Sequence, residues 1–254
     1  RHNCIYKWDQ NTKEISRYRT SSNSNGLARD KYGRLLVCEY TVEHRRITRT
    51  EYDGSTTVLA ETYDGYKLNA PNDLTVSKDN SVWFTDPPRG LQGVAERGFH
   101  GLYRIDGATG KLTLMADDII GPNGIAFSPD ESVLYVVEGR TTPRSILAYD
   151  LVDQGKRIVN KRKFVDCADA LPDGITVDAD GNLWCAWGGS PENNGIAVFN
   201  PQGRRIAFIP TPERITNLVF GGEEKNRLLM TSANSLYALL VNAQPAGPSF
   251  FIPR

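Results

Sequence analysis

The stretch Pro122-Asn123-Gly124-Ile125-Ala126-Phe127, followed after a turn by Val133-Leu134-Tyr135-Val136, contains the pattern that decides the fold. The pattern is an Asx residue, a small or acidic residue, apolar alternation, a turn and a short apolar strand. It occurs five times, starting at Asn25, Asn72, Asn123, Asp173 and, more loosely, Asn217. A period of about 40–50 residues with several short strands per unit is typical of a β-propeller.

Each unit also has a second half that repeats. Residues 101–106 form an alternating strand, Asp106 and Gly110 mark a tight turn, and residues 111–114 form another strand. Each unit therefore contains four predicted strands. The chain start, residues 5–15, matches only this second half, so we expect a six-bladed β-propeller whose first blade is incomplete at the N-terminus.

The predicted domain organisation is a single all-β domain over residues 1–254. We expect about 30 further residues, carrying the inner strands of the first unit, to precede Arg1 in the natural protein. The 254 residues are 39% apolar, which is enough to bury one sizeable core. No long helix is predicted.

The charge balance argues against some partners. Thirty basic and thirty acidic residues give zero net charge, which disfavours nucleic acid or an anionic membrane surface as the main partner. No apolar run approaches the roughly 20 residues that a membrane helix needs. We expect a monomer or weak dimer that binds a small molecule. The short basic run His44-Arg45-Arg46 is interpreted as an exposed strand face.

The four cysteines have no spacing typical of a metal site, and the three histidines have none either. Cys38 and Cys185 occupy corresponding positions in the second strands of two units, so we interpret the cysteines as buried free thiols and reject zinc bound through them. This pattern favours a cytoplasmic location and leaves a periplasmic or secreted one open. Residues 87–100 and 138–144 are predicted loops over one face, of a length often used for binding.

The repeated Asx residues form the candidate chemical site. In a propeller the innermost strands converge on one mouth, so oxygens of Asn25, Asn72, Asn123, Asp173 and Asn217 would meet there. Carboxylate and amide oxygens suit calcium or magnesium. A single carboxylate supplies little charge, so a second acid is expected from the missing first unit. Alternatively, each Asx-Gly pair only shapes a tight turn.

Several motifs together match a known family. They are Asn25-Gly26-Leu27-Ala28, Leu68-Asn69-Ala70-Pro71-Asn72-Asp73, Phe84-Thr85-Asp86-Pro87-Pro88, Pro122-Asn123-Gly124-Ile125, Pro172-Asp173-Gly174-Ile175 and Phe220-Gly221-Gly222. With these motifs the chain resembles, over nearly its whole length, the gluconolactonase / senescence-marker-protein (regucalcin) family of six-bladed propellers. It resembles the sugar gluconolactonases within that family most closely.

The resemblance implies a divalent metal, usually Ca²⁺, held by Asn123 and Asp173 with Asn72 lining the same site. Zn²⁺, Mg²⁺ or Mn²⁺ could occupy the same oxygen site. The family's first-unit glutamate is not in this sequence. Ala70 stands where some animal members carry a substrate-contacting arginine, and Tyr40 where histidine is common, so the rim of the site is expected to differ there.

The resemblance also implies hydrolysis of a sugar lactone, such as glucono-1,5-lactone, to the aldonic acid. The metal would polarise the lactone carbonyl. Asp173 would act as general base or orient the water, and water activated by the metal is an equal alternative. Asn25 and Asn72 would bind substrate hydroxyls, with Asp86 and Arg144 as rim candidates.

Three other functions stay open at this point. One is a different metal-dependent ester or phosphotriester hydrolase on the same ligands, and another is a non-catalytic propeller that binds a protein or peptide. The third is a calcium-binding regulatory role. A serine nucleophile is disfavoured because no G-x-S-x-G phrase occurs.

Overall fold

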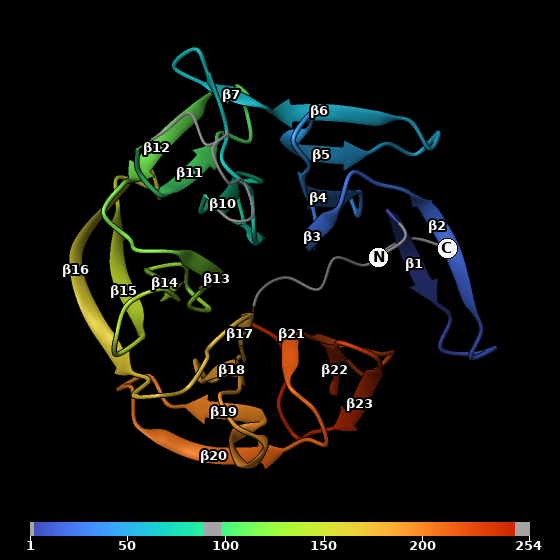
Figure 1. The fold of residues 1–254 in the computed structure, drawn as a ribbon, viewed down its shortest axis with the longest axis vertical. Coiled ribbons are helices and arrows are strands. Elements are labelled where there is room, and N and C mark those ends of the chain that lie inside the picture. Colours follow the sequence, from blue (N-terminus) through green and yellow to red (C-terminus); the bar gives the residue numbers. More distant parts are fainter. Residues whose placement is uncertain (1–2, 89–97, 247–254) are drawn as a thin grey trace. The chain divides into compact units, whose positions relative to one another are not determined.

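Strands make up almost all the regular structure of this protein (Figure 1). The computed structural model describes residues 3–88 and 98–246, so most of the predicted 87–100 loop lies outside the described residues. Within these ranges the only helix is the three-residue 3₁₀ helix η1 (Pro191–Asn193). The sequence likewise predicted no long helix. None of the described helical structure has the length and apolar character of a membrane span.

The described residues up to Asp118 form one compact unit. Its strands pair antiparallel into two four-stranded sheets and two small hairpins, each in sequence order. The sheets are β3 (Ser24–Arg29), β4 (Leu35–Tyr40), β5 (Arg45–Thr50) with β6 (Thr56–Ala60), and β9 (Leu74–Val76), β10 (Val82–Asp86), β11 (Gly101–Ile105) with β12 (Leu112–Ala116). The hairpins are β1 (Cys4–Trp8) with β2 (Ile15–Thr20), and β7 (Thr62–Tyr63) with β8 (Tyr66–Lys67).

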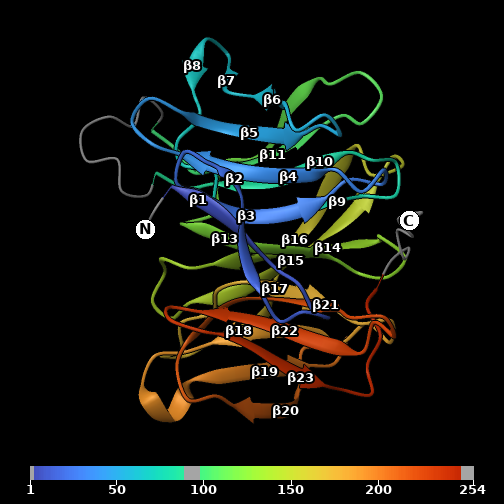
Figure 2. The ribbon, with the colours of Figure 1, turned by 90° about the vertical axis from the view of Figure 1, so that its right-hand side faces the viewer.

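The described residues from Ile119 onward form a second compact unit with three antiparallel sheets. The first sheet contains β13 (Pro122–Phe127), β14 (Val133–Glu138), β15 (Ser145–Val152) and β16 (Arg157–Asp166). The second contains β17 (Ile175–Val177), β18 (Leu183–Trp187), β19 (Gly195–Phe199) and β20 (Arg205–Pro210), and Figure 2 shows the last three following one another in that order. The third contains β21 (Ile215–Gly221), β22 (Arg227–Ser232) and β23 (Leu236–Leu240).

The fold class is an all-β propeller, as predicted, but the blade count differs from the prediction. The described part of the chain forms five blades, four with four strands and one with three, rather than six. The hairpin of β1 and β2, counted from the sequence as the remains of a sixth blade, pairs only with itself and forms a separate two-stranded sheet. Two strands supply no inner pair, so this hairpin does not constitute a blade.

The turn between the first and second strand of each blade has the same backbone geometry five times. A residue with positive φ occupies its last corner in every case: Gly33, Asn80, Glu131, Gly181 and Lys225. Each donates its backbone N–H to the carbonyl three residues earlier, over 2.8–3.2 Å. These residues are spaced like the Asx positions, so the sequence period is a period of identical turns. Glycine adopts positive φ without strain, whereas other residues bear a cost there.

This geometry makes Lys225→Gly a stabilising substitution. Lys225 has φ of 56°, in the left-handed region where a side chain costs about 1–2 kcal/mol. Glycine removes that cost and adds some entropy to the unfolded chain, so we expect the free energy of unfolding to rise by roughly 0.5–1 kcal/mol. Denaturant unfolding followed by circular dichroism measures it. Gly181→Ala, at the equivalent corner, should lower stability by about 1 kcal/mol, and equal effects of the two changes would contradict the account.

In the four-stranded blades most core residues lie on the second and third strands, whereas in the last blade they lie on β21 and β22. All residues of β10, β11, β18 and β19 are buried. Phe84 stacks on Tyr103 at 5.3 Å between ring centroids. Cys38, Cys167 and Cys185 are buried free thiols, which confirms that interpretation for three of the four cysteines, while Cys4 is partly exposed. Burial raises the pKa of the Cys38 and Cys185 thiols well above the ordinary value, so both are inert at neutral pH.

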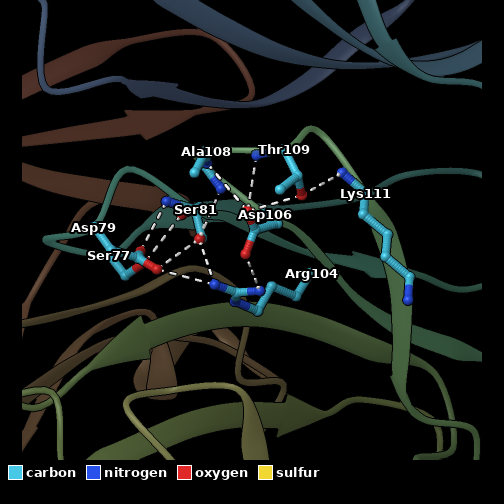
Figure 3. Close-up of polar contacts among 9 residues, drawn as sticks. Ser77, Asp79, Ser81, Arg104, Asp106, Ala108, Thr109 and Lys111 are labelled. Atoms are coloured by element: carbon cyan, nitrogen blue, oxygen red, sulfur yellow. Dashed lines mark hydrogen bonds and ion pairs between the residues drawn. The ribbon is translucent and has the colours of Figure 1, made fainter.

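A buried arginine ties together two turns of the β9–β12 blade (Figure 3). Arg104 Nη1 contacts Asp106 and Nη2 contacts Asp79, both at 2.9 Å, and Nη2 also donates to Ser81 Oγ. Hydrogen bonds from the backbone and hydroxyl of Thr109, and then from Arg104, hold the pKa of Asp106 well below its usual range. Both carboxylates are thus satisfied within the blade, so the cluster stabilises turns.

The basic run 44–46 is not the exposed face that the sequence predicted. His44 is exposed, but Arg45 is only 2% exposed. Arg46 Nε reaches Glu39 Oε2 at 2.9 Å, and Arg19 Nη1 reaches the other carboxylate oxygen at 3.2 Å. Glu39 itself is 1% exposed. The prediction was wrong for Arg46 because a buried carboxylate on the neighbouring strand β4 binds its side chain.

Candidate functional site

The inner strands of the second unit approach one another very closely at the glycine that follows each Asx. A Cβ at Gly124 would lie 2.3 Å from the carbonyl oxygen of Asp173. A Cβ at Gly174 would lie 2.3 Å from Oδ1 of Asn217. Such separations exclude any side chain. The glycines therefore let Asn123, Asp173 and the start of β21 lie side by side, as the neighbouring labels β13, β17 and β21 in Figure 1 illustrate.

The same contact occurs in the first unit. A Cβ at Gly26 would lie 2.6 Å from Cα of Asp73, and the Gly26 N–H donates to the Asn72 carbonyl at 2.8 Å. In the second unit the Gly174 N–H donates in the same way to Thr216 at 3.0 Å. Both observations identify Thr216, rather than Asn217, as the counterpart of Asn72.

The fifth repeat is therefore shifted by one residue from the sequence prediction. Asn217 corresponds to Asp73, because the side-chain Oδ1 of each accepts the backbone N–H of the following leucine, over 2.8 and 2.9 Å. Thr216 Oγ1 instead bonds across to Thr231 on β22. The Asn217 oxygen thus shapes the chain locally, the turn-forming alternative left open above. The sequence prediction missed this shift because it aligned Asn217 with Asn72. The correct alignment places Thr216-Asn217-Leu218 on Asn72-Asp73-Leu74, so that the two asparagines do not coincide.

Asp173 is held by an arginine that the sequence did not predict. Its Oδ2 lies 2.8 Å from Arg214 Nη2, with the aspartate side chain 18% exposed and the arginine 41% exposed. The Asp173 N–H donates to Ala186 on β18, which fixes the backbone beneath the carboxylate. Arg214 lies 41 residues away, immediately before β21, and no motif marks it. Only the adjacency of the two inner strands reveals the pair.

Asn123 is partly buried at the start of β13, next to the turn after β14. A Cβ at Gly139 would lie 3.8 Å from Asn123 Cβ, so the bare glycine makes room for the amide. The predicted 138–144 loop is fastened locally, since Arg144 Nε donates to the Gly139 carbonyl at 3.0 Å. Arg144 therefore supports the loop behind Asn123, and its contact with substrate stays a prediction.

The predicted residues of the first unit have unequal exposure. Asn25 is exposed, and Asn72 is 5% exposed. Asp86, predicted at the rim, is completely buried, and its Oδ2 accepts the N–H of Asn69 at 2.8 Å. The rim placement of Asp86 is thus corrected, because the Asn69 backbone draws its carboxylate into the blade.

The donor chemistry in the second unit fits a hard cation. Asn123, at the start of β13, offers an amide oxygen, and Asp173, just before β17, offers a carboxylate, which are oxygen types that Ca²⁺ binds. No group of three or more histidine, cysteine, aspartate or glutamate side chains gathers as a metal site within residues 3–88 and 98–246. Amide oxygens would therefore have to supply part of any shell here, which disfavours thiolate- or imidazole-bound metals.

Comparison with known proteins identifies related chains. The family model described as "SMP-30/Gluconolactonase/LRE-like region" matches residues 1–234. A gluconolactonase of Zymomonas mobilis is 34% identical over 226 residues, which is 83% of this chain and 61% of the relative. A lactonohydrolase of Aspergillus oryzae is 28% identical over 221 residues, covering 77% of this chain and 50% of the relative. The chain thus spans about half to three fifths of these curated relatives.

A solved structure supports the same relationship. A gluconolactonase from Xanthomonas campestris superposes with a TM-score of 0.85 at 34% identity, covering 94% of this chain and 79% of that one. Agreement in sequence and in backbone extends over nearly all the blades described above.

Proposed function

We propose, from the premise that this chain belongs to the SMP-30/gluconolactonase/LRE-like family, that it hydrolyses a sugar lactone of the glucono-1,5-lactone type to the aldonic acid. The observation that carries the proposal is the Asp173 carboxylate. Arg214 holds this carboxylate, and the Asp173 backbone lies beside the strand segment that follows Asn123. Catalysis of ester cleavage needs a fixed acceptor for the proton of water. A carboxylate pinned in one orientation and still partly exposed supplies that acceptor.

We further propose that Asn123 and Asp173 hold a divalent cation, most simply Ca²⁺. When bound, such an ion supplies Lewis-acid polarisation of a carbonyl and compensates the charge that develops on its oxygen. Within the protein, Asp173 orients the attacking water and accepts its proton. The sequence pattern adds Asn72 to both the metal-binding and the substrate-binding set, and adds Asn25 and Arg144 as substrate-binding residues. Asp86 is completely buried and is not included.

A lactone assay with and without chelator tests this function. We expect the protein to hydrolyse glucono-1,5-lactone above the spontaneous rate, to lose activity after exhaustive chelation, and to regain it with added Ca²⁺. The released acid is followed by pH-stat titration, with the spontaneous reaction measured in the same buffer. Full activity after chelation would contradict the metal-assisted part, and no activity with any aldonolactone would contradict the function.

A further inference from the structure

Arg214 forms an ion pair with the Asp173 carboxylate. We propose that it is a positioning residue for Asp173 and thereby sets both the affinity for the cation and the rate of hydrolysis, an inference that rests on the function proposed above. The Nη2–Oδ2 distance of 2.8 Å is that of a strong charge-assisted hydrogen bond. A carboxylate anchored through one oxygen cannot rotate freely, so the direction of its second oxygen is restricted as well.

The position of Arg214 is itself built into the fold. A Cβ at Gly188 would lie 3.0 Å from both Cγ and Cδ of Arg214 and 3.1 Å from its Nε, so the arginine stem lies against a bare glycine. The Gly188 carbonyl accepts the N–H of Leu171 at 2.8 Å, two residues before Asp173. Gly188 therefore connects the support of the arginine to the segment that carries the carboxylate.

The hydrogen bonding of Arg214 is directed toward Asp173. Its Nε is buried and has no hydrogen-bond partner in the described part of the chain, whereas its Nη2 donates to Asp173 Oδ2 at 2.8 Å. The Nη2 end of the guanidinium therefore carries the contact that orients the carboxylate.

Hydrogen-bonded partners of metal-binding side chains typically change metal affinity or activity 10- to 100-fold when they are removed. For Arg214→Gln we therefore expect the Ca²⁺ dissociation constant, measured by calorimetry, to rise about tenfold. We expect kcat for glucono-1,5-lactone to fall about tenfold, with KM changed less than twofold. Arg214→Lys, which retains one cationic donor, should recover part of both losses.

A matched control is available in the same unit. Arg162 pairs with Asp150 at 2.7 Å, and the two side chains are 45% and 35% exposed. Arg162→Gln should leave Ca²⁺ affinity and kcat unchanged. Gly188→Ala, which keeps the arginine but displaces its stem, should shift both quantities in the direction of Arg214→Gln by a smaller factor.

A double variant separates positioning from a general structural role. If Arg214 acts through Asp173, adding Arg214→Gln to Asp173→Asn should cause no further loss of kcat beyond that of Asp173→Asn alone. Wild-type protein that binds Ca²⁺ and hydrolyses lactone while Arg214→Gln behaves like Arg162→Gln would overturn the inference and leave the function standing. Wild-type protein that neither binds Ca²⁺ nor hydrolyses lactone would overturn the proposed function and the inference with it.

Discussion

Replacement of Asp173 by alanine is expected to reduce the kcat for glucono-1,5-lactone by about 10³-fold or more and to remove measurable Ca²⁺ binding. Asp173 is the carboxylate of the site in the second unit, and its loss removes the proton acceptor together with the anionic donor for the cation. Steady-state titration of the released acid measures the first effect and calorimetry the second. Asp173→Asn, which preserves the shape, should lose nearly as much.

The fold should survive this substitution. The ion pair of Asp173 with Arg214 is partly exposed, so its loss costs less than about 1 kcal/mol. Asp180→Ala removes an exposed carboxylate in the turn after β17 and should leave kcat unchanged. An Asp173→Ala protein that is folded by circular dichroism and retains more than a tenth of wild-type kcat would contradict the role given to this residue.

Replacement of Glu39 by alanine is expected to destabilise the protein by about 3 kcal/mol. Glu39 is 1% exposed and forms ion pairs with Arg19 and Arg46 through separate carboxylate oxygens. Removing one partner of a buried ionic group leaves the other charges without compensation. The two arginine side chains retain 14% and 21% exposure, so water offsets part of the loss and places the effect at the low end of the usual range.

Chemical denaturation, with the midpoint and slope both recorded, measures the effect of Glu39→Ala. Arg157→Ala is the control, because Arg157 forms an exposed pair with Asp153, with 66% and 57% side-chain exposure. It should leave the unfolding midpoint within experimental error. If the two substitutions shifted the midpoint equally, the buried ion pairs of Glu39 would not stabilise the fold.

The repeat pattern predicted a large part of the fold because it reports local geometry. The residues that close the first turn of each blade, from Gly33 to Lys225, share a positive φ and one backbone hydrogen bond. Such a turn depends on its own few residues, so its spacing is visible in the sequence. The glycines after Asn25, Asn123 and Asp173 are also part of the repeat, but the structure shows that they make room for a neighbouring inner strand.

The errors concern contacts between strands that are far apart in sequence. Asp86 is buried because the backbone of Asn69, 17 residues earlier, supplies a hydrogen bond for its carboxylate. The blade count was wrong because the pairing of β1 and β2 with no other strand cannot be deduced from a hairpin pattern. The fifth repeat was misaligned by one residue because Thr216 shows its equivalence to Asn72 only through the hydrogen bond it accepts from Gly174.

By itself, the sequence determined the all-β propeller class, the strand order within blades and the candidate oxygen ligands, because turn chemistry and alternation act over a few residues. Tertiary structure alone decided which of these side chains are buried and what holds Asp173. Arg214 becomes its partner because glycines at positions 174 and 188 let the start of β21 approach β17 and β18 without steric conflict. That approach depends on backbone distances between strands, which no local pattern contains.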